Sequence, residues 1–513
     1  MSSRLIPACL KAFVVMLTAG VVLSVAGCTM TPGNGASQKE SGTTSVQQYG
    51  KAAVFTPSDG ITLSQHTPLN KWAKLVPDIT DALKSQGFKN ADITTKTSDG
   101  LDKQSRDIQD YVVKHAVSGK DSGSDGSQED TDGTAQAITL IVAPAMETSD
   151  TTRQYGDYAS RPADDGDAAG DDDSDAEQRL VNALQLAKES GMHVVLMANA
   201  LDGFTPDAFV ELSTAQRIGA IQADKLVDKL QLDTISKDNP KAIEILLPYS
   251  ASTDEDGAEK TEDAAFAKDA FAGAWSVLQP YFKQGKAYSP SGLLTAGTTA
   301  AQWRNVAFDA AKDSNITDEL DARLSGAKDG EHTRIDGIIA MNDYVASGVT
   351  EAFDKLGYTG TAADINPSIT LPGIVDNITG KHDLQRGKVP DPIKAPEENA
   401  GDDSDSKEAQ WPIITGYGAY LDQIPQIVNG RQWMTALENR QRIAEDLAKV
   451  TAALNNGESL TGITDLARER YAGASSKKTL VPTIRVDLLA VSASNLKSTM
   501  IDTGYISMAE AGL

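Results

Sequence analysis

The sequence predicts an α/β fold of two lobes, each a doubly wound parallel sheet, joined by a hinge of several strands. Three observations predict this fold. The apolar runs are short and nearly continuous, which is typical of strands covered on both faces. These runs alternate with helical patterns, which favours parallel sheets with right-handed crossovers. The alternation occurs twice in a chain of 513 residues, which is long enough for two domains.

The first lobe is expected to comprise residues 54–205 and 434–470. Its elements alternate as a parallel sheet requires. They are a strand over 60–65, a helix over 69–86, a strand over 91–97, a helix over 104–117, a strand over 137–144, a helix over 176–191 and a strand over 193–198.

The second lobe is expected to comprise residues 206–433 and 471–513. Sheets of this type bind ligands beyond the carboxyl ends of their strands, and two facing lobes make a cleft there. The chain is expected to cross between the lobes near residues 202–209, 432–437 and 472–481. The elements of this lobe are a strand over 242–248, a helix over 264–283, strands over 287–292 and 335–341, a helix over 345–356 and a strand over 412–417.

Residues 1–27 have the pattern of an export signal. Arg4 and Lys11 precede an apolar run over 12–26, and three small residues stand before Cys28. This pattern resembles the lipobox of bacterial lipoproteins, in which cleavage leaves the cysteine N-terminal and lipid-modified. An ordinary signal peptide with an incidental cysteine is the alternative. Residues 28–53 hold little to bury and are expected to be a flexible tether.

The cysteine count and the apolar runs bear on location and on the core. Of the two cysteines, Cys9 lies in the predicted signal, so the mature chain would have no internal disulfide. No further apolar run reaches the roughly 18 residues of a membrane span. We therefore expect attachment to the outer face of the cell membrane through the lipid anchor only.

The formal net charge of −25 disfavours nucleic acid as a partner, because the phosphate backbone is itself densely negative. Much of the acidity lies in blocks that lack apolar residues, which we interpret as solvated insertions. Calcium binding is the alternative, but the blocks do not have the ligand spacing of an EF-hand loop. The blocks lie near residues 118–134, 146–177, 252–264 and 390–410.

The sequence has none of the motifs that would indicate an enzyme. It lacks a G-x-S-x-G elbow, a phosphate-binding loop and a glycine-rich dinucleotide turn after a strand. Asp376 and Asp422 could be proposed as glycosidase carboxylates only if their separation were known. We therefore expect no catalytic residue, no metal and no cofactor. The histidines show no metal-ligand spacing; they are His66, His115, His193, His332 and His382.

A short apolar run over residues 337–341 stops at Asn342 and Asp343, where a helical pattern begins. Asparagine and aspartate are preferred helix caps, so the pair has a structural explanation. The pair also stands at the carboxyl end of a strand, where the cleft is expected. The sequence alone leaves both interpretations open.

Five segments resemble, in the same order, segments of the xylose-type and multiple-sugar periplasmic binding proteins, the type 1 solute-binding proteins of sugar ABC importers. The resemblance runs from about Gly60 to Tyr505 and is interrupted by the acidic insertions. The segments are LNKWAKLVPDITDALKSQGF, GAWSVLQPYFKQGKAYSPSGLLTAGTTAAQW, DGIIAMNDYVASGVTEAF, TGYGAYLDQIPQIVNGRQWMT and LVPTIRVDLLAVSASNLKSTMIDTGY.

The resemblance implies a sugar held between the lobes by polar side chains and by aromatic rings. It places Trp72 and Trp303 beside the sugar and Asn342 at a hydroxyl-binding amide, with Asp343 either joining the site or capping the helix. Together with residues at matching positions, the expected ligand-binding set is Lys71, Trp72, Asn199, Trp303, Asn342, Asp343 and Tyr417.

The chain also departs from the family pattern. Where the family has Tyr-Asp-Arg, this chain has Ala198, Asn199 and Ala200, and where it has Gln-Asp, this chain has Tyr417 and Gly418. The family's Glu is Tyr420, and the arginine before Trp72 is Lys71, which lacks the planar fork. Losing these charge-assisted bonds would weaken binding of the usual sugar by several kcal/mol. Asp376 is a candidate replacement carboxylate.

Three functional hypotheses follow from these observations. The first is a lipid-anchored receptor that binds a sugar or related polyol by hinge closure and delivers it to the permease subunits of an ABC importer. The second is a sensor or orphan lipoprotein of the same fold, with a diverged or lost sugar site. A surface hydrolase or adhesion module is disfavoured, because no catalytic constellation is present.

Overall fold

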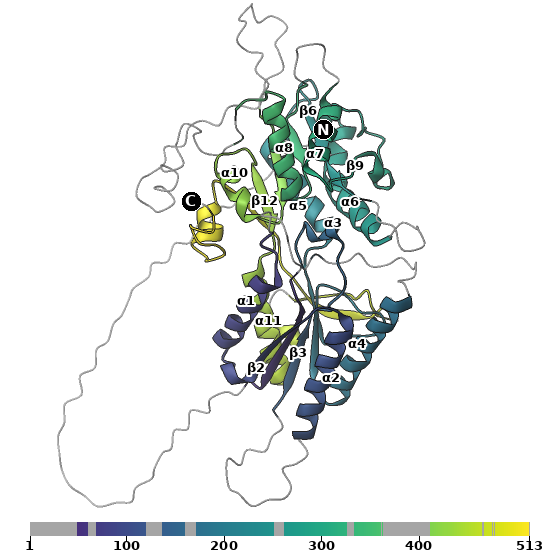
Figure 1. Ribbon diagram of the computed structural model, residues 1–513, viewed down its shortest axis with the longest axis vertical. Helices are drawn as coiled ribbons and strands as arrows, with labels where there is room; N and C mark the ends of the chain where they lie inside the picture. The colour runs from purple at the N-terminus through teal and green to yellow at the C-terminus, as the bar shows by residue number, and fades with distance from the viewer. Residues whose placement is uncertain are drawn as a thin grey trace, which may run out of the picture. The chain divides into compact units, whose positions relative to one another are not determined.

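Two mostly parallel sheets organise the protein, as a computed structural model shows (Figure 1). Both sheets lie in the unit that spans Gln48–Leu513. The structure describes residues 49–59, 68–118, 136–157, 159, 171–250, 261–325, 333–360, 362, 411–463, 466–474, 476 and 478–511.

The first sheet has seven strands in the order β13-β14-β5-β4-β3-β1-β2. All neighbours are parallel except β13 and β14. The strands are β1 (Lys51–Pro57), β2 (Ile93–Ser98), β3 (Ile138–Val142), β4 (His193–Met197), β5 (Ala208–Glu211), β13 (Leu466–Arg470) and β14 (Leu480–Arg485).

Helices cover both faces of the first sheet (Figure 1). In β1, Ala52 and Val54 pack in an apolar cluster with α1 (Trp72–Gln86) and α11 (Arg440–Asn455). Ala53 and Phe55 pack in another with α2 (Leu101–Ser118) and α4 (Asp171–Glu189). Successive residues of a strand point to opposite faces, so the sheet is doubly wound.

The second sheet has six strands in the order β15-β12-β11-β10-β6-β8, and only β15 is antiparallel to its neighbour. A separate parallel pair joins β7 (Leu247–Pro248) to β9 (Ala307–Phe308). The strands of the sheet are β6 (Lys241–Ile245), β8 (Ala287–Tyr288), β10 (Gly337–Ile339), β11 (Ile413–Tyr417), β12 (Met434–Leu437) and β15 (Leu489–Ser492).

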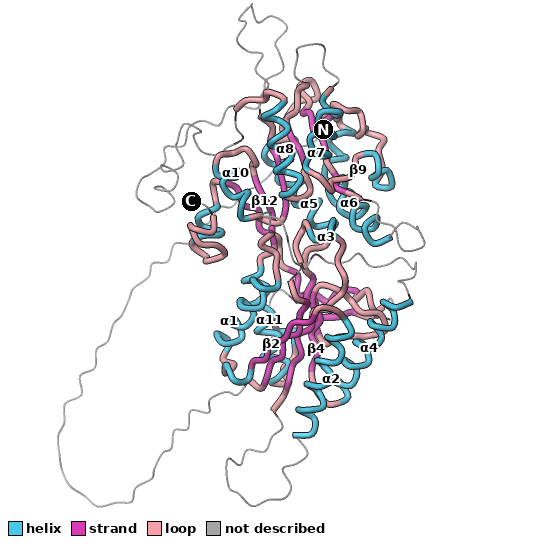
Figure 2. Tube along the Cα trace, viewed as in Figure 1, coloured by secondary structure: helices cyan, strands magenta, loops and turns pink. Residues whose placement is uncertain are grey.

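The second sheet is also covered on both faces (Figure 2). Ile339 packs in a cluster with α5 (Ala215–Leu230) and α6 (Thr261–Lys283). Its neighbour Ile338 packs with α7 (Asp313–Leu324) and α8 (Asp343–Lys355). The remaining helical turns are short: α3 (Asp150–Arg153), α10 (Ile424–Val428), η1 (Asn90–Asp92), η2 (Ala300–Asn305), η3 (Leu421–Gln423), η4 (Leu460–Gly462) and the π-helical η5 (Lys497–Ile501).

The predicted α/β class with two doubly wound sheets is confirmed. The five expected helices correspond to α1, α2, α4, α6 and α8, and the expected strands from residue 91 onward to β2, β3, β4, β6, β8, β10 and β11. The strand expected over 60–65 lies outside the described residues. The described helices include none with the length and apolar character needed to cross a membrane.

The boundary of the tether needs correction. Strand β1 begins at Lys51, although residues 28–53 were expected to be a flexible tether. Ala52 and Ala53 are fully buried in the centre of the sheet. Alanines add little apolar signal, which explains why the sequence pattern places the start of the fold a few residues late.

Three strands belong to a different sheet from the one that the expected lobe boundaries assign them to. Strands β5 and β14 belong to the first sheet, and β12 belongs to the second. The crossings consequently lie at residues 212–214, 438–439 and 486–488, a few residues beyond the expected ones. A short strand beside a crossing has no local pattern that tells which sheet it joins, because pairing is decided by tertiary contacts.

Candidate ligand-binding site

Loops at the carboxyl ends of the two sheets contact each other directly. Leu69, which precedes α1, donates from its N–H to the carbonyl of Gly418, which follows β11, at 2.9 Å. The loop after β3 reaches the second sheet as well, because the hydroxyl of Tyr420 donates to the carbonyl of Gln154 at 2.7 Å. The site expected between the two sheets can therefore be described from its contacts.

Asn342, the first residue of the Asn342–Asp343 pair after β10, both caps a helix and faces the other lobe. Its Oδ1 accepts from the Val345 N–H at 2.8 Å, which makes it the N-cap of α8. Its Nδ2 donates to Oε1 of Gln154 at 3.1 Å, toward the loop of the first sheet. Its side chain is buried, so both halves of the amide are used inside the protein.

Asp343 is not the helix cap; the cap is Asn342. The Asp343 carboxylate is fully buried and accepts from Gln432 Nε2 and Thr435 Oγ1, both at 2.7 Å, and from the Tyr420 N–H at 3.0 Å. Burial raises the pKa of Asp343 to about 6, although these three donors oppose the shift. Asp343 therefore braces the loops after β10 and β11 within the second lobe.

Gly416 is required for this brace. A Cβ at this position would lie 2.2 Å from Oδ1 of Asp343 and 2.7 Å from Nε2 of Gln432. The carboxylate can reach its partners only because the strand carries no side chain there.

Lys71 and Trp72 contact one acidic residue of the chain itself. Lys71 Nζ lies 3.0 Å from Oδ2 of Asp157, and the two side chains are 13% and 4% exposed. Trp72 is buried, and its Nε1 donates to the Asp157 carbonyl at 3.2 Å. Asp157 belongs to the insertion expected near residues 146–177, so the expectation of a wholly solvated insertion was wrong.

Tyr417 is fully buried and its hydroxyl pairs with the hydroxyl of Ser213. Burial, together with the charge of Glu438, raises the pKa of Tyr417 well above its ordinary value. Hydrogen bonds with Ser213 and Asn70 oppose this shift. The ring lies 6.3 Å from that of Tyr155, centre to centre.

Trp303 lies within η2, and Asn199 lies just after β4. Trp303 is buried in the apolar cluster that also holds Tyr155 and Tyr417, and the Arg304 guanidinium lies 4.4 Å from its ring centre. Asn199 is half-buried and follows β4 at the carboxyl edge of the first sheet. Of the expected residues, Lys71, Trp72, Asn342 and Tyr417 thus meet around the loop after β3, whereas Asp343 is engaged within the second lobe.

Several residues of the site were missed by the sequence analysis. Asn70 is 1% exposed and contacts two other segments, since its Nδ2 donates to the Tyr155 carbonyl at 3.3 Å and its Oδ1 accepts from the Glu438 N–H at 3.3 Å. Asp157 donates from its N–H to the Asn70 carbonyl at 2.8 Å. The signal that could have found this loop is Tyr155, a large aromatic residue in an otherwise polar stretch.

A cluster of polar residues joins the three crossings. Ser213, on the first crossing, donates to Oε1 of Glu438, on the second, at 2.8 Å. Arg217 donates to the carbonyl of Val486, on the third. Burial raises the pKa of Glu438 to about 7, opposed by Arg217 and Ser213. Within the described residues, Oε2 of Glu438 has no hydrogen-bond partner.

The described residues include no group of three or more His, Cys, Asp or Glu side chains that could hold a metal ion. His115 lies on α2 beside the Tyr111 carbonyl, and His193 begins β4 near Asp207. Asp422 lies in the short helical turn η3. The other residues singled out in the sequence fall outside the described part of the chain; they are Cys9, Cys28, His66, His332, Asp376 and His382.

Comparison with known proteins confirms the resemblance read from the sequence. No family model matches the chain. The chain is 22% identical over 331 residues to a multiple sugar-binding periplasmic protein of Azospirillum brasilense, which is 64% of this chain and 71% of the relative.

Solved structures similar to this chain include an ABC transporter solute-binding protein and a carbohydrate transporter solute-binding protein, both 17% identical with a TM-score of 0.47. One, from Clostridium phytofermentans, has bound β-D-glucose, and the match covers 90% of this chain and all of that one. The other, from Chloroflexus aurantiacus, is in complex with D-glucose, and the match covers 90% of this chain and 98% of that one.

Proposed function

We propose that this protein is an extracytoplasmic solute-binding protein of an ABC importer, and that it binds a sugar or a related polyol between its two sheets. One observation carries the proposal: Lys71 and Trp72 of the first lobe and Asn342 and Tyr417 of the second all contact the same loop, residues 154–157, at the carboxyl ends of the strands. Amides and charged groups suit sugar hydroxyls, and aromatic rings suit the apolar faces of a pyranose. The likeness to a multiple sugar-binding protein supports the same ligand class.

Binding would proceed by rotation of the lobes about the three crossings. A solute that touches both lobes stabilises the closed form in proportion to its preference for that form. The closed form would be the one that the permease subunits recognise. The cluster of Ser213, Arg217 and Glu438 ties the crossings together, so the rotation is expected to pivot there.

We further propose that the chain is held at the cell membrane by lipid on Cys28. Replacing Cys28 by Ser in the full-length chain is expected to move the protein from the membrane fraction to the soluble fraction and to abolish incorporation of labelled palmitate. Cys9→Ser is the matched control and is expected to leave both unchanged. Equal fractionation of all three proteins would favour the ordinary signal peptide.

A sensor or orphan lipoprotein of the same fold is the second candidate. It is favoured by Tyr417 and Gly418, which stand where the resemblance implies a Gln-Asp pair, and by Ala198 and Ala200 in place of charged or hydroxyl-bearing residues. Such a protein would fold in the same way and would fail to bind common sugars.

A thermal-shift screen of the full-length Cys28→Ser chain against pentoses, hexoses, polyols and short oligosaccharides tests the proposal. A solute at 100 times its dissociation constant stabilises the native state by about 2.7 kcal/mol, which raises the melting temperature measurably. Asn342→Asp keeps a good helix cap but removes the amide donor, so it is expected to abolish the shift.

Asn429→Asp is the matched control. Asn429 is exposed, its Oδ1 accepts from the Arg431 N–H and its Nδ2 donates to Gln426, so the change again keeps the acceptor and removes the amide donor, and the shift is expected to stay intact. A cooperative melt with no shift for any solute would overturn sugar binding and favour the sensor or orphan candidate.

A further inference from the structure

Residues 149–157 lie in an insertion whose composition predicts exposure to solvent, yet they are packed against the site. Tyr155 is 1% exposed, Gly156 is buried, and the Asp157 side chain is 4% exposed. A polar segment of this kind becomes buried only where the surrounding protein offers matching partners. Those partners come from both lobes.

On the side of the second lobe, the segment uses the residues expected to contact a ligand. The Gln154 side chain accepts from Asn342, and its carbonyl accepts from the hydroxyl of Tyr420. The Tyr155 ring lies 4.9 Å from Phe266 and 6.3 Å from Tyr417, centre to centre. The short helix α3 also contacts α6 (Figure 1).

On the side of the first lobe, the segment uses the other half of the expected site. Asp157 forms the ion pair with Lys71 and accepts from the Trp72 indole. Asn70 donates to the carbonyl of Tyr155 and accepts from the N–H of Asp157. Carboxylate, amide and aromatic groups of the segment thus meet the donors and rings that a sugar would need.

The fit depends on a glycine. Gly156 has φ of +123°, and a Cβ there would lie 2.4 Å from Cβ and 2.8 Å from the carbonyl oxygen of Asn70. Any other residue would force the backbone of the segment away from Asn70. The segment therefore lies against the site in a conformation that its own sequence specifies.

We propose that residues 149–157 are an internal ligand: they occupy the site between the two lobes, hold the lobes together without a solute, and must withdraw before a solute can bind. A group that touches both lobes favours the closed form, whether it is free or part of the chain. A solute that competes with it binds with an apparent affinity reduced by the fraction of molecules whose site is free. The bridging between the lobes is independent of the proposed function, whereas the competition rests on it.

The bridging is tested by measuring the distance between the lobes in the full-length chain without solute. Cys9 and Cys28 are replaced by Ser, and spin labels are attached to cysteines introduced at Arg106 on α2 and Asp321 on α7, both exposed. Electron–electron double resonance is expected to give one narrow distance distribution for this chain. Gly156→Ala is expected to lengthen and broaden it.

Gly203→Ala is the matched control. Gly203 also has a positive φ, of +76°, but a Cβ there would meet nothing within 4 Å, so only backbone strain is introduced. Its distribution is expected to match that of the parent. Gln154→Ala is the mild variant that retains the fold, since it removes one side-chain hydrogen bond with Asn342. An unchanged distance in both Gly156→Ala and Gln154→Ala would overturn the bridging.

The competition is tested by titrating Gly156→Ala, Gln154→Ala and the parent chain with each sugar of the screen. The apparent dissociation constant is expected to fall at least tenfold in Gly156→Ala and less in Gln154→Ala. Equal constants in all three chains would overturn the competition while leaving sugar binding in place. If no sugar binds to any of the three chains, the proposed function is overturned. The bridging between the lobes is then tested by the spin-label distances alone.

Discussion

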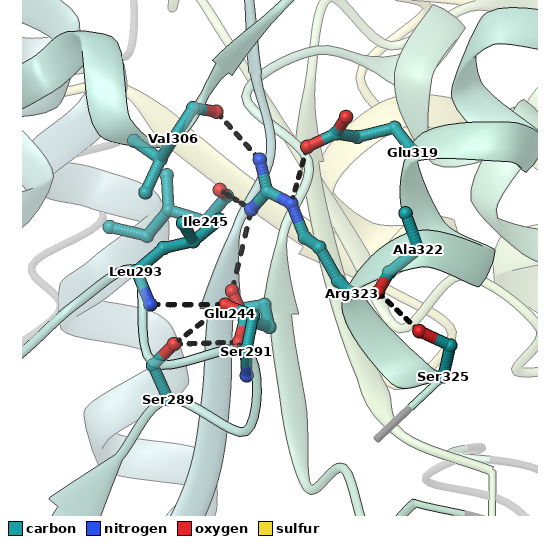
Figure 3. Close-up of polar contacts among 10 residues, drawn as sticks. All are labelled: Glu244, Ile245, Ser289, Ser291, Leu293, Val306, Glu319, Ala322, Arg323 and Ser325. Carbon is teal, nitrogen blue, oxygen red and sulfur yellow. Dashed lines mark hydrogen bonds and ion pairs between the residues drawn. The ribbon is translucent and has the colours of Figure 1, made fainter.

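Two buried glutamates of the second sheet have very different surroundings. Glu244, in β6, is fully buried and accepts from Ser289 Oγ at 2.7 Å and from the Ser291 N–H at 3.0 Å (Figure 3). Its other oxygen pairs with Arg323 at 3.4 Å. Glu438, one residue after β12, is equally buried, but only Ser213 donates to it and its Oε2 has no partner among the described residues.

The difference follows from where the two residues lie. Arg323 reaches from α7 to Glu244 and also donates to the carbonyls of Ile245 and Val306, so this cluster fastens parts of a single lobe (Figure 3). Glu438 lies on a crossing, beside segments that lead to the other lobe. A completely satisfied network makes a structure rigid, whereas an incompletely satisfied one is held less firmly. The pairing of the buried carboxylates thus distinguishes the interior of a lobe, which is expected to stay rigid, from the crossings, about which the lobes are expected to rotate.

Removing the cation of the satisfied cluster has the largest expected effect. Arg323→Leu leaves Glu244 buried without its counter-charge, and breaking such a pair costs about 3–5 kcal/mol. Urea unfolding is expected to show a correspondingly lower midpoint with an unchanged slope.

Lys355→Leu is the control for this change. Lys355 is exposed and lies 3.9 Å from Glu351, so its loss should change the free energy of unfolding by less than about 0.5 kcal/mol. If Arg323→Leu lowers the free energy of unfolding by less than about 1 kcal/mol, the cluster around Glu244 is held no more firmly than the one around Glu438.

The next largest effect is a pH dependence that originates at Glu438. Its folded pKa of about 7 lies above the ordinary value of 4.5, so the folded state binds the proton more tightly than the unfolded state. Its contribution to stability is therefore fully present below pH 4.5 and is lost as the pH rises through 7. At about 1.4 kcal/mol per pKa unit, the change amounts to about 3 kcal/mol.

Glu438→Gln cannot titrate, so its free energy of unfolding should vary less than that of the parent between pH 6 and 8.5. Asp343, with a folded pKa of about 6, shifts in the same direction but titrates mostly below this window and is present in both proteins. Urea unfolding at four pH values checks the expectation. Parallel curves for the two proteins would mean that Glu438 is charged throughout.

The sequence was sufficient for the fold because its long periodic segments decide their own conformation. The helical patterns over 69–86 and 264–283, for example, reappear as α1 and α6. The sequence was insufficient for the crossings, because β5, β12 and β14 have four to six residues each and pair according to tertiary contacts.

The site was predictable to the extent that the resemblance located it. Asn342 was correctly expected to follow a strand and to open a helix, but the cap belongs to Asn342 and not to Asp343. The partners of Lys71 and Trp72 could not be predicted, because they lie about 85 residues away in an insertion whose composition indicates solvent. Tyr155 is a local signal that part of this insertion is buried, but its packing against Phe266 and Tyr417 is a tertiary property that no local pattern reports.

The smallest expected effect comes from a matched pair of hydroxyl deletions. Ser289→Ala removes one donor from Glu244, which keeps the Ser291 N–H and Arg323, so the loss should be about 1 kcal/mol and independent of pH between 6 and 8.5. Ser213→Ala removes the one donor that Glu438 has among the described residues, so it disfavours the charged form and moves the pKa above 7.

The two substitutions therefore differ mainly in how the loss of stability depends on pH, and less in the size of that loss. For Ser213→Ala the fall in stability should begin at the same pH as in the parent, because the unfolded pKa of Glu438 is unchanged, and should continue to a higher pH. The loss relative to the parent should therefore grow as the pH rises above 7. The Tyr417 hydroxyl also loses its acceptor, since Ser213 uses its own proton toward Glu438. If the two alanine variants lose the same amount at every pH, the crossing is as firmly held as the cluster of Arg323, and rotation must pivot elsewhere.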